Sequence, residues 1–117
     1  MSAPGIRVAM SKLERIEDWA ERMKRTDYKV GPLARICRVS ERQLRRYVRR
    51  RFSLTPLEWI KQERMKQTRL SLERGCSVKA VATEAGFKWP EQLSRQFKGF
   101  YGEPPSHVRA GVHRAQG

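Results

Sequence analysis

The residues of this sequence best suited to chemistry are arginines gathered in one short stretch. Residues 35–51 hold eight arginines and a single acid, Glu41. The arginine side chain is a planar, permanently charged fork of N–H donors that fits phosphate oxygens and the N7 and O6 atoms of guanine. This stretch therefore predicts binding to a polyanion, and to nucleic acid in particular.

A helix must position these arginines, and Leu44 and Val48 define its inner face. If these two side chains point into a core, Arg42, Arg45 and Arg46 lie toward the other side, near the helix end that normally enters a groove of DNA. We predict that these three contact bases, with guanine preferred, and the alternative for each is a contact to phosphate alone. The predicted phosphate contacts on and beside this helix are Ser40, Arg49, Arg50 and Arg51.

This region occurs twice in the sequence, about 48 residues apart. Each copy is predicted to form a helix, a tight turn and a second helix. Duplex DNA repeats about every 34 Å, the spacing at which paired helix-turn-helix units place their second helices in the major groove. The aligned positions are Val30, Leu33, Ala34, Cys37 and Val39 with Val78, Val81, Ala82, Ala85 and Phe87, and then Leu44, Arg46, Val48, Phe52 and Pro56 with Leu93, Arg95, Phe97, Tyr101 and Pro105.

The second copy carries a weaker recognition surface. With Leu93 and Phe97 as inward anchors, the candidates for base contact are Glu91, Gln92 and Arg95. Glutamine pairs with adenine and arginine with guanine, whereas glutamate can only accept a hydrogen bond, from cytosine N4, and otherwise repels phosphate. The second unit is therefore predicted either to contact mostly the DNA backbone or to read a short and tolerant site.

Further contacts are predicted around the second unit. Trp89 precedes its recognition helix and is predicted to pack against Leu93, with stacking on a base as the alternative. The helix starts at Pro32, Ser77 and Pro90 offer backbone N–H groups to phosphates. The side chains predicted to contact phosphate here are Ser77, Lys79, Lys88, Ser94 and Lys98.

Capping and periodicity give the helix boundaries. A first helix is predicted from Ser11 through Met23, and a second is predicted to start at Pro32. Ser40 is predicted to cap the third helix, which buries Phe52. The long helix that follows is predicted to start at Pro56 and to run to Arg74, because apolar residues recur along it at Leu57, Ile60, Met65, Leu70 and Leu72.

Only helices are predicted, so the fold class is all-α, with about seven helices in two helix-turn-helix subdomains joined by a long linker helix. The linker, about 27 Å long at about 1.5 Å per residue, is expected to present both recognition helices to the same side of the molecule, separated by about one turn of duplex DNA. We predict a flexible lead over 1–10, the first subdomain over 11–54, the linker helix over 55–74, the second subdomain over 75–110, a tail over 111–117, and recognition helices over about 41–51 and 90–101.

The composition supports this interpretation. The 117 residues carry 26 lysines and arginines against 12 acids, a formal charge of +14, with 38% hydrophobic residues for a modest core. Cys37 and Cys76 lack metal-ligand spacing, and His107 and His113 have no catalytic partner, so we predict neither an enzyme nor a cofactor. No apolar stretch could span a membrane and no secretory signal opens the chain, so we predict no membrane partner and a cytoplasmic, nucleoid-associated location.

Three segments carry a resemblance to a known family: VGPLARICRVSERQLRRYVRRRF, TPLEWIKQERMKQTRLSLERG and SVKAVATEAGFKWPEQLSRQFKGFYGEPPSHVR. From about Leu13 to Arg109 the chain resembles the DNA-binding domain of the AraC/XylS family of transcription regulators, and the compact whole resembles its MarA/SoxS-type members. The last segment is the most diagnostic, because the family signature has the same residue types at Gly86, Phe87, Leu93, Arg95, Phe97, Gly102, Pro105 and Arg109.

The resemblance implies seven helices, monomeric binding to one asymmetric double-stranded DNA site, and promoter activation through RNA polymerase. Arg38 and Ser53 depart from the family pattern, which has glycine at both positions, and Val48 stands where phenylalanine is usual. The family's base-contacting positions match Arg42, Arg45 and Arg46 in the first unit and Pro90, Glu91, Gln92 and Arg95 in the second.

The main alternative is a sequence-indifferent nucleic-acid-binding or architectural protein, because a charge of this size binds any polyanion. A regulator of this kind acts alone, or it is part of a longer protein that carries a sensor or dimerisation domain. The sequence leaves both alternatives open.

Overall fold

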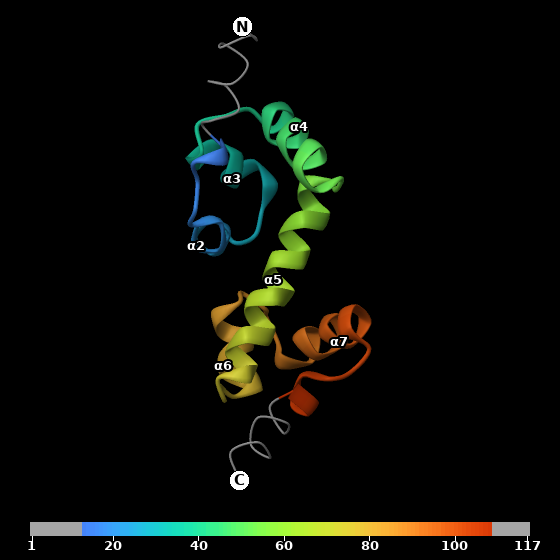
Figure 1. Ribbon diagram of the computed structural model, residues 1–117. Helices are drawn as coiled ribbons and strands as arrows, with labels where there is room; N and C mark the ends of the chain where they lie inside the picture. The colour runs from blue at the N-terminus through green and yellow to red at the C-terminus, as the bar shows by residue number, and fades with distance from the viewer. Residues whose placement is uncertain (1–12, 109–117) are drawn as a thin grey trace, which may run out of the picture. The chain divides into compact units, whose positions relative to one another are not determined.

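The computed structural model describes residues 13–108, and its regular elements are helices (Figure 1). The chain divides into two compact units, Met1–Lys61 and Gln62–Gly117. The predicted all-α class with two helix-turn-helix subdomains is confirmed, whereas the predicted lead and tail lie outside the described residues. In chain order the helices are α2 (Trp19–Arg25), α3 (Val30–Ile36), α4 (Glu41–Phe52), α5 (Pro56–Glu73), α6 (Val78–Glu84) and α7 (Pro90–Tyr101), and a helical turn covers residues 105–108.

In the first unit, α3 packs against α2 and α4, and the start of α5 completes the core. Trp59, from the first turn of α5, is 4% exposed, and its ring centroid lies 4.8 Å from that of Trp19. The prediction that Phe52 is buried is wrong, because this side chain is 42% exposed. Phe52 instead stacks on the Trp59 ring, with 5.4 Å between the two centroids.

The first predicted helix is interrupted. Residues 16–18 are not helical and α2 begins only at Trp19, so the prediction of one helix running through Met23 is wrong. Asp18 precedes α2, and its carboxylate accepts a hydrogen bond from Arg22 Nε at 2.9 Å, which lowers the pKa of Asp18. An acid at a helix start and a cation one turn later both favour a start here, and hydrophobic periodicity does not detect them.

The second helix begins earlier than predicted. α3 starts at Val30, so Pro32 occupies its third position rather than its first. Proline is tolerated there because the first backbone N–H groups of a helix have no partner inside the helix. The later helices begin where the capping residues predict, at Glu41, Pro56, Val78 and Pro90.

The turn between the paired helices has the same backbone conformation in both units. The N–H of Val39 donates to the carbonyl five residues back in α3 at 3.1 Å, and the N–H of Phe87 does the same to α6 at 2.8 Å. The left-handed residue inside the turn is Arg38 in the first unit, with φ 58°, and Gly86 in the second, with φ 79°. The predicted repeat is therefore a repeat of conformation, and it strains the arginine by about 1 kcal/mol.

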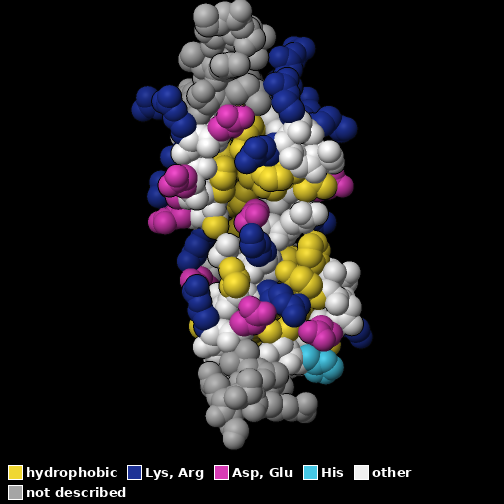
Figure 2. Space-filling model, in the orientation of Figure 1, with side chains coloured by type: hydrophobic (Ala, Val, Ile, Leu, Met, Phe, Trp, Pro, Cys, Tyr) yellow, Lys and Arg dark blue, Asp and Glu magenta, His cyan; other side chains and the backbone are white. Residues whose placement is uncertain are grey.

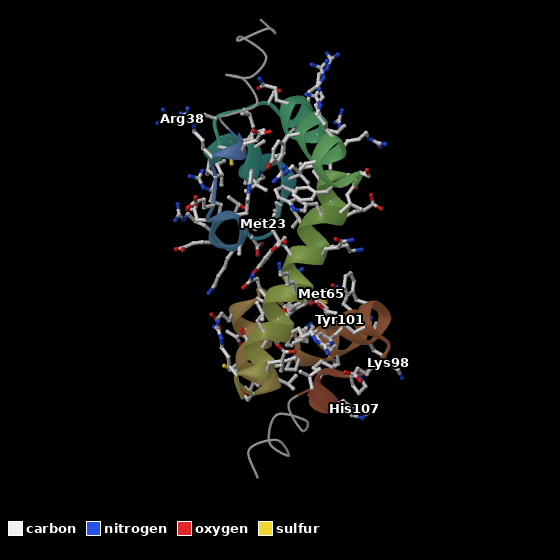
Figure 3. The ribbon with its side chains drawn as sticks, in the orientation of Figure 1. Met23, Arg38, Met65, Lys98, Tyr101 and His107 are labelled. Carbon is white, nitrogen blue, oxygen red and sulfur yellow. The ribbon has the colours of Figure 1, made fainter. Side chains whose placement is uncertain are left out.

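The repeat also includes a helix that precedes each turn. The segment ERMKRT at residues 21–26, in and just after α2, and the segment ERMKQT at residues 63–68 of α5 differ at one position. Met23 and Met65 are buried, each in the core of its own unit (Figure 3). The threonine that ends each segment donates its hydroxyl to the carbonyl four residues earlier at 2.8 Å. Each unit is therefore a three-helix module, and the second module begins inside α5.

Helix α5 serves the two units in turn. Thr55 caps it, because the N–H of Glu58 donates to Thr55 Oγ1 at 3.2 Å and Glu58 Oε1 accepts from the N–H of Thr55 at 2.9 Å. Two of the apolar residues that predicted this helix, Leu57 and Leu70, are 57% and 37% exposed. Because α5 contributes side chains to two separate cores, its buried residues do not form one continuous apolar stripe. Trp59 and Ile60 pack in the first core, and Met65 and Leu72 pack in the second.

In the second unit, α6 and α7 pack together and share a core with the second half of α5. Leu93 and Phe97 are fully buried, as predicted, and Phe87 is 6% exposed. The guanidinium of Arg64 lies 3.8 Å from the centroid of the Phe87 ring, and its Nε donates to the Ala85 carbonyl at 3.0 Å. These contacts hold the turn against α5. Among residues 13–108, no helix is both long and apolar enough to cross a membrane.

Candidate nucleic-acid interface

Helix α4 is fixed at its start by a reciprocal cap. Ser40 Oγ accepts a hydrogen bond from the N–H of Gln43 at 3.0 Å, and Gln43 Oε1 accepts one from the N–H of Ser40 at 2.8 Å. The buried side chains Leu44, Tyr47 and Val48 then hold one face of the helix in the core. A cap and three buried anchors leave the helix one orientation within its unit, so the direction of its other side chains is defined.

The outer face of α4 is cationic. At about 100° per residue, Arg42, Arg46 and Arg49 lie opposite the buried face, with Arg45 and Arg50 beside them. All five are exposed, and Lys and Arg side chains stand out at the edges of this unit in Figure 2. This face, defined by Arg42, Arg46 and Arg49, is called the α4 outer face below.

Of the carboxylates near α4, Glu58 lies close enough to Arg49 for that guanidinium to help lower its pKa, whereas Glu41 is directed away from the α4 outer face. Glu41 lies beside α3, because a Cβ atom added to Gly31 would be 3.3 Å from Glu41 Oε2. Within the described part of the chain, no ion pair engages Arg42, Arg45 or Arg46. The three guanidinium groups are therefore available to an external anion.

Arg51, a predicted phosphate contact, is exposed but lies near the inner side of α4. Burial raises the pKa of Tyr47, and the nearby Arg51 guanidinium partly opposes that rise because it favours the phenolate. The structure therefore places Arg51 beside an aromatic hydroxyl, away from the α4 outer face.

Helix α7 repeats this arrangement with different side chains. Pro90 is its first residue, and Leu93 and Phe97 are its buried anchors. Glu91, Arg95 and Lys98 then lie opposite the buried face, at the positions that Arg42, Arg46 and Arg49 hold in α4, and all three are exposed. Lys98 points away from its unit in Figure 3. This set, the α7 outer face, contains an acid where the first unit has an arginine.

Gln92 is partly committed to the structure of its own helix. Its Oε1 accepts a hydrogen bond from the N–H of Lys88 at 3.1 Å, much as Gln43 does at the start of α4. Adenine recognition by glutamine uses the carbonyl oxygen and the amide nitrogen together. In this conformation one of the two lone pairs of Gln92 Oε1 is already engaged, so a contact to adenine would have to share that oxygen with the N–H of Lys88.

The prediction that Trp89 packs against Leu93 is wrong. Trp89 is 61% exposed, whereas Leu93 is fully buried, and the Trp89 side chain makes no hydrogen bond that caps α7. A proline follows Trp89 and favours its extended backbone, with φ −136° and ψ 146°. The indole therefore stands in solvent at the start of the helix.

The remaining phosphate candidates lie on exposed or partly exposed positions. Ser77 Oγ accepts from the N–H of Ala80 at 3.1 Å and so caps α6, yet its hydroxyl hydrogen can still donate to a phosphate. Ser94 is half-buried, and Lys79 and Lys88 are exposed. Their contacts to phosphate stay predictions.

The described residues offer no alternative centre for metal chemistry. Among residues 13–108, no three His, Cys, Asp or Glu side chains come together in a group that could hold a metal ion. Cys37 is buried in the core of the first unit, and Cys76 is exposed.

Comparison with known proteins places the chain in a family. A helix-turn-helix domain family matches residues 33–111. The chain belongs to the AraC-type helix-turn-helix family. A comparison with curated protein sequences found no match.

Solved structures of AraC-type domains share the fold. The DNA-binding domain of AdpA, a global transcriptional factor solved in complex with a target DNA, is 29% identical, with a TM-score of 0.66 over 87% of this chain and 100% of that one. An AraC-type transcriptional regulator from Chromobacterium violaceum is 18% identical, with a TM-score of 0.69 over 94% and 96% of the two chains. The C-terminal domain of AraT, a response regulator from Geobacillus stearothermophilus, is 18% identical, with a TM-score of 0.67 over 93% and 86%.

Proposed function

We propose that this AraC-type chain is a sequence-specific, double-stranded DNA-binding transcription regulator that places α4 and α7 in the major groove. The observation that carries the proposal is the α4 outer face, in which Arg42, Arg46 and Arg49 are exposed opposite three buried anchors. A helix with side chains fits the major groove, which is about 12 Å wide. Arginine is the residue that most often reads a base there, through guanine O6 and N7.

The two helices are proposed to have different tasks. α4 carries six arginines and one glutamate, so it supplies most of the attraction to phosphate and the guanine contacts. α7 carries one arginine, one lysine and one glutamate, so it binds weakly and penalises sites that offer no donor to Glu91. The AraC-type relative solved with a target DNA supports this class of function.

Selection of bound duplexes from a random pool tests the proposal. We expect the selected duplex to outcompete random duplex by a factor of about 10³ or more in a competition titration. A ratio close to one would contradict sequence-specific regulation and would favour the sequence-indifferent, architectural alternative. The guanines of the selected site should cluster where α4 binds.

The salt dependence of binding tests the groove geometry separately. If 6 to 8 phosphates are neutralised, log K should fall against log salt with a slope of about −5 to −7. A slope shallower than about −2 would contradict a helix that tracks the groove.

Partner and location follow from the same proposal. The expected ligand is a promoter site bound by one copy of the chain in the cytoplasm, with RNA polymerase as the protein partner. Sedimentation of the complex with the selected duplex would test the stoichiometry, for which we expect one chain per duplex.

A further inference from the structure

One tryptophan stands apart from the other two. Trp89 is 61% exposed at the start of α7, whereas Trp59 is 4% exposed and Trp19 packs against it. A large aromatic ring that is exposed to water forgoes the favourable free energy that burial of its apolar surface would give. The Trp89 ring is therefore available to a partner outside the chain.

The first unit has a serine at the position that corresponds to Trp89, and this difference between the units is informative. Ser40 holds the same place before α4, and its hydroxyl caps that helix at 3.0 Å; Ser77 caps α6 in the same way at 3.1 Å. Serine is among the most favourable residues at this position, and large apolar residues are among the least favourable. The Trp89 side chain makes no such cap; the N–H of Gln92 instead donates to the Trp89 carbonyl at 3.1 Å, and Gln92 Oε1 accepts from the N–H of Lys88 at 3.1 Å.

The surroundings of Trp89 fit a nucleic acid. Lys88 precedes it, and Glu91, two residues later, begins the α7 outer face that continues with Arg95 and Lys98. In the major groove the only apolar group that a base presents is the C5-methyl group of thymine. An exposed ring at the groove-entering end of a helix meets that methyl group more readily than it meets a phosphate.

We propose that Trp89 contacts the C5-methyl group of a thymine in the part of the site bound by α7. This inference rests on the proposed DNA-binding function. It gives the second unit an apolar means of sequence recognition, where the first unit relies on charge.

A first experiment separates DNA contact from a structural role. Trp89→Ser restores the arrangement of Ser40, so its melting temperature should rise by about 4 °C while its affinity for the selected duplex falls about tenfold. Leu57→Ser is the matched control, because Leu57 is 57% exposed in the other unit and lies outside both outer faces. The control should bind within about twofold of the unsubstituted chain. A Trp89→Ser variant that binds as tightly as the unsubstituted chain would overturn the inference.

A second experiment removes only the methyl group. Each thymine of the selected duplex is replaced in turn by deoxyuridine, and one replacement should weaken binding of the unsubstituted chain about fourfold. The same replacement should leave Trp89→Ser binding unchanged. The inference is overturned if no replacement has an effect, if the effect persists in Trp89→Ser, or if the site contains no thymine where α7 binds. A chain that prefers no duplex at all contradicts the proposed function instead, so the two failures are distinct.

Discussion

The two units share a backbone and differ in the surfaces that they expose. Leu44 and Leu93 are buried at matched positions, and both units place a left-handed residue at the same two points. On the exposed side, α4 has arginines where α7 has Glu91, Gly99 and Phe100. Burial fixes which residues the duplicated module must keep, and the exposed positions are free to diverge. The proposed function therefore assigns attraction to one copy of the module and selectivity to the other.

The largest effects should come from the matched core leucines. Leu44→Ala and Leu93→Ala each truncate a fully buried side chain, so each should lower the free energy of unfolding by about 2–5 kcal/mol. Urea denaturation followed by circular dichroism measures both. The two values should agree within about 1 kcal/mol, and a gap above about 2 kcal/mol would break the equivalence of the units.

The arginines of α4 test its orientation. Arg46→Ala should weaken binding to the selected duplex by about 1–3 kcal/mol and relax the preference at one base pair. Arg50→Ala, the control, should weaken selected and random duplexes alike and reduce the salt slope by about 1. Competition titrations distinguish the two outcomes. The reverse pattern would mean that the groove meets a different face of α4.

The charge difference between the outer faces can be removed. Glu91→Arg gives α7 the residue that α4 has at Arg42, so affinity for random duplex should rise about fivefold. Affinity for the selected duplex should rise less, because a discriminating acid is lost. Arg42→Glu is the reciprocal variant and should lower both affinities. Equal gains on both duplexes for Glu91→Arg would contradict a selective role for Glu91.

The left-handed residues that end α4 and α7 can be exchanged. Ser53 has φ 59° and Gly102 has φ 81°, and an added Cβ at Gly102 would meet no atom within 4 Å. The exchange therefore isolates backbone strain. Ser53→Gly should raise the free energy of unfolding by about 0.5 kcal/mol, and Gly102→Ser should lower it by about 1 kcal/mol. Thermal melts check both, and shifts of the same sign would contradict this account.

The smallest effect concerns acid sensitivity of the cap on α5. The hydrogen bond from the N–H of Thr55 lowers the pKa of Glu58 below its ordinary value of 4.5. The ionised cap therefore stabilises the folded chain above that pH and loses its effect as the pH falls through the lowered pKa. Glu58→Gln should melt below the unsubstituted chain at about pH 7, and the gap should narrow between about pH 5 and pH 3. A gap that stays constant would contradict this role.

Local signals predicted the elements that carry the candidate interface. Ser40 begins α4, Pro90 begins α7 and Gly102 ends it, because caps and left-handed glycines act within a few residues. The inner faces of both helices were equally accessible to prediction, since one helix against one core produces one apolar stripe. The base contacts stay predictions.

Features that depend on distant partners could not be predicted. Leu57 and Trp59 are both apolar and close in sequence. Trp59 is the buried one because it packs against Trp19, which lies far away in the sequence. The 61% exposure of Trp89 likewise depends on tertiary packing and not on its neighbours in sequence. The repeated segments at 21–26 and 63–68 were visible in the sequence, and a comparison that included the helix before each turn would have found them.

These near-identical segments also have a consequence for folding. Each segment carries a methionine that is buried in the core of its own unit, so we expect α2 to compete during folding for the place of the second half of α5, within one molecule or between two. Trp19 favours the observed arrangement, because it packs against Trp59 in the first core, whereas the corresponding position in α5 is Lys61. The contact between Trp19 and Trp59 thus distinguishes two segments of nearly identical sequence and favours the docking of each in its own unit.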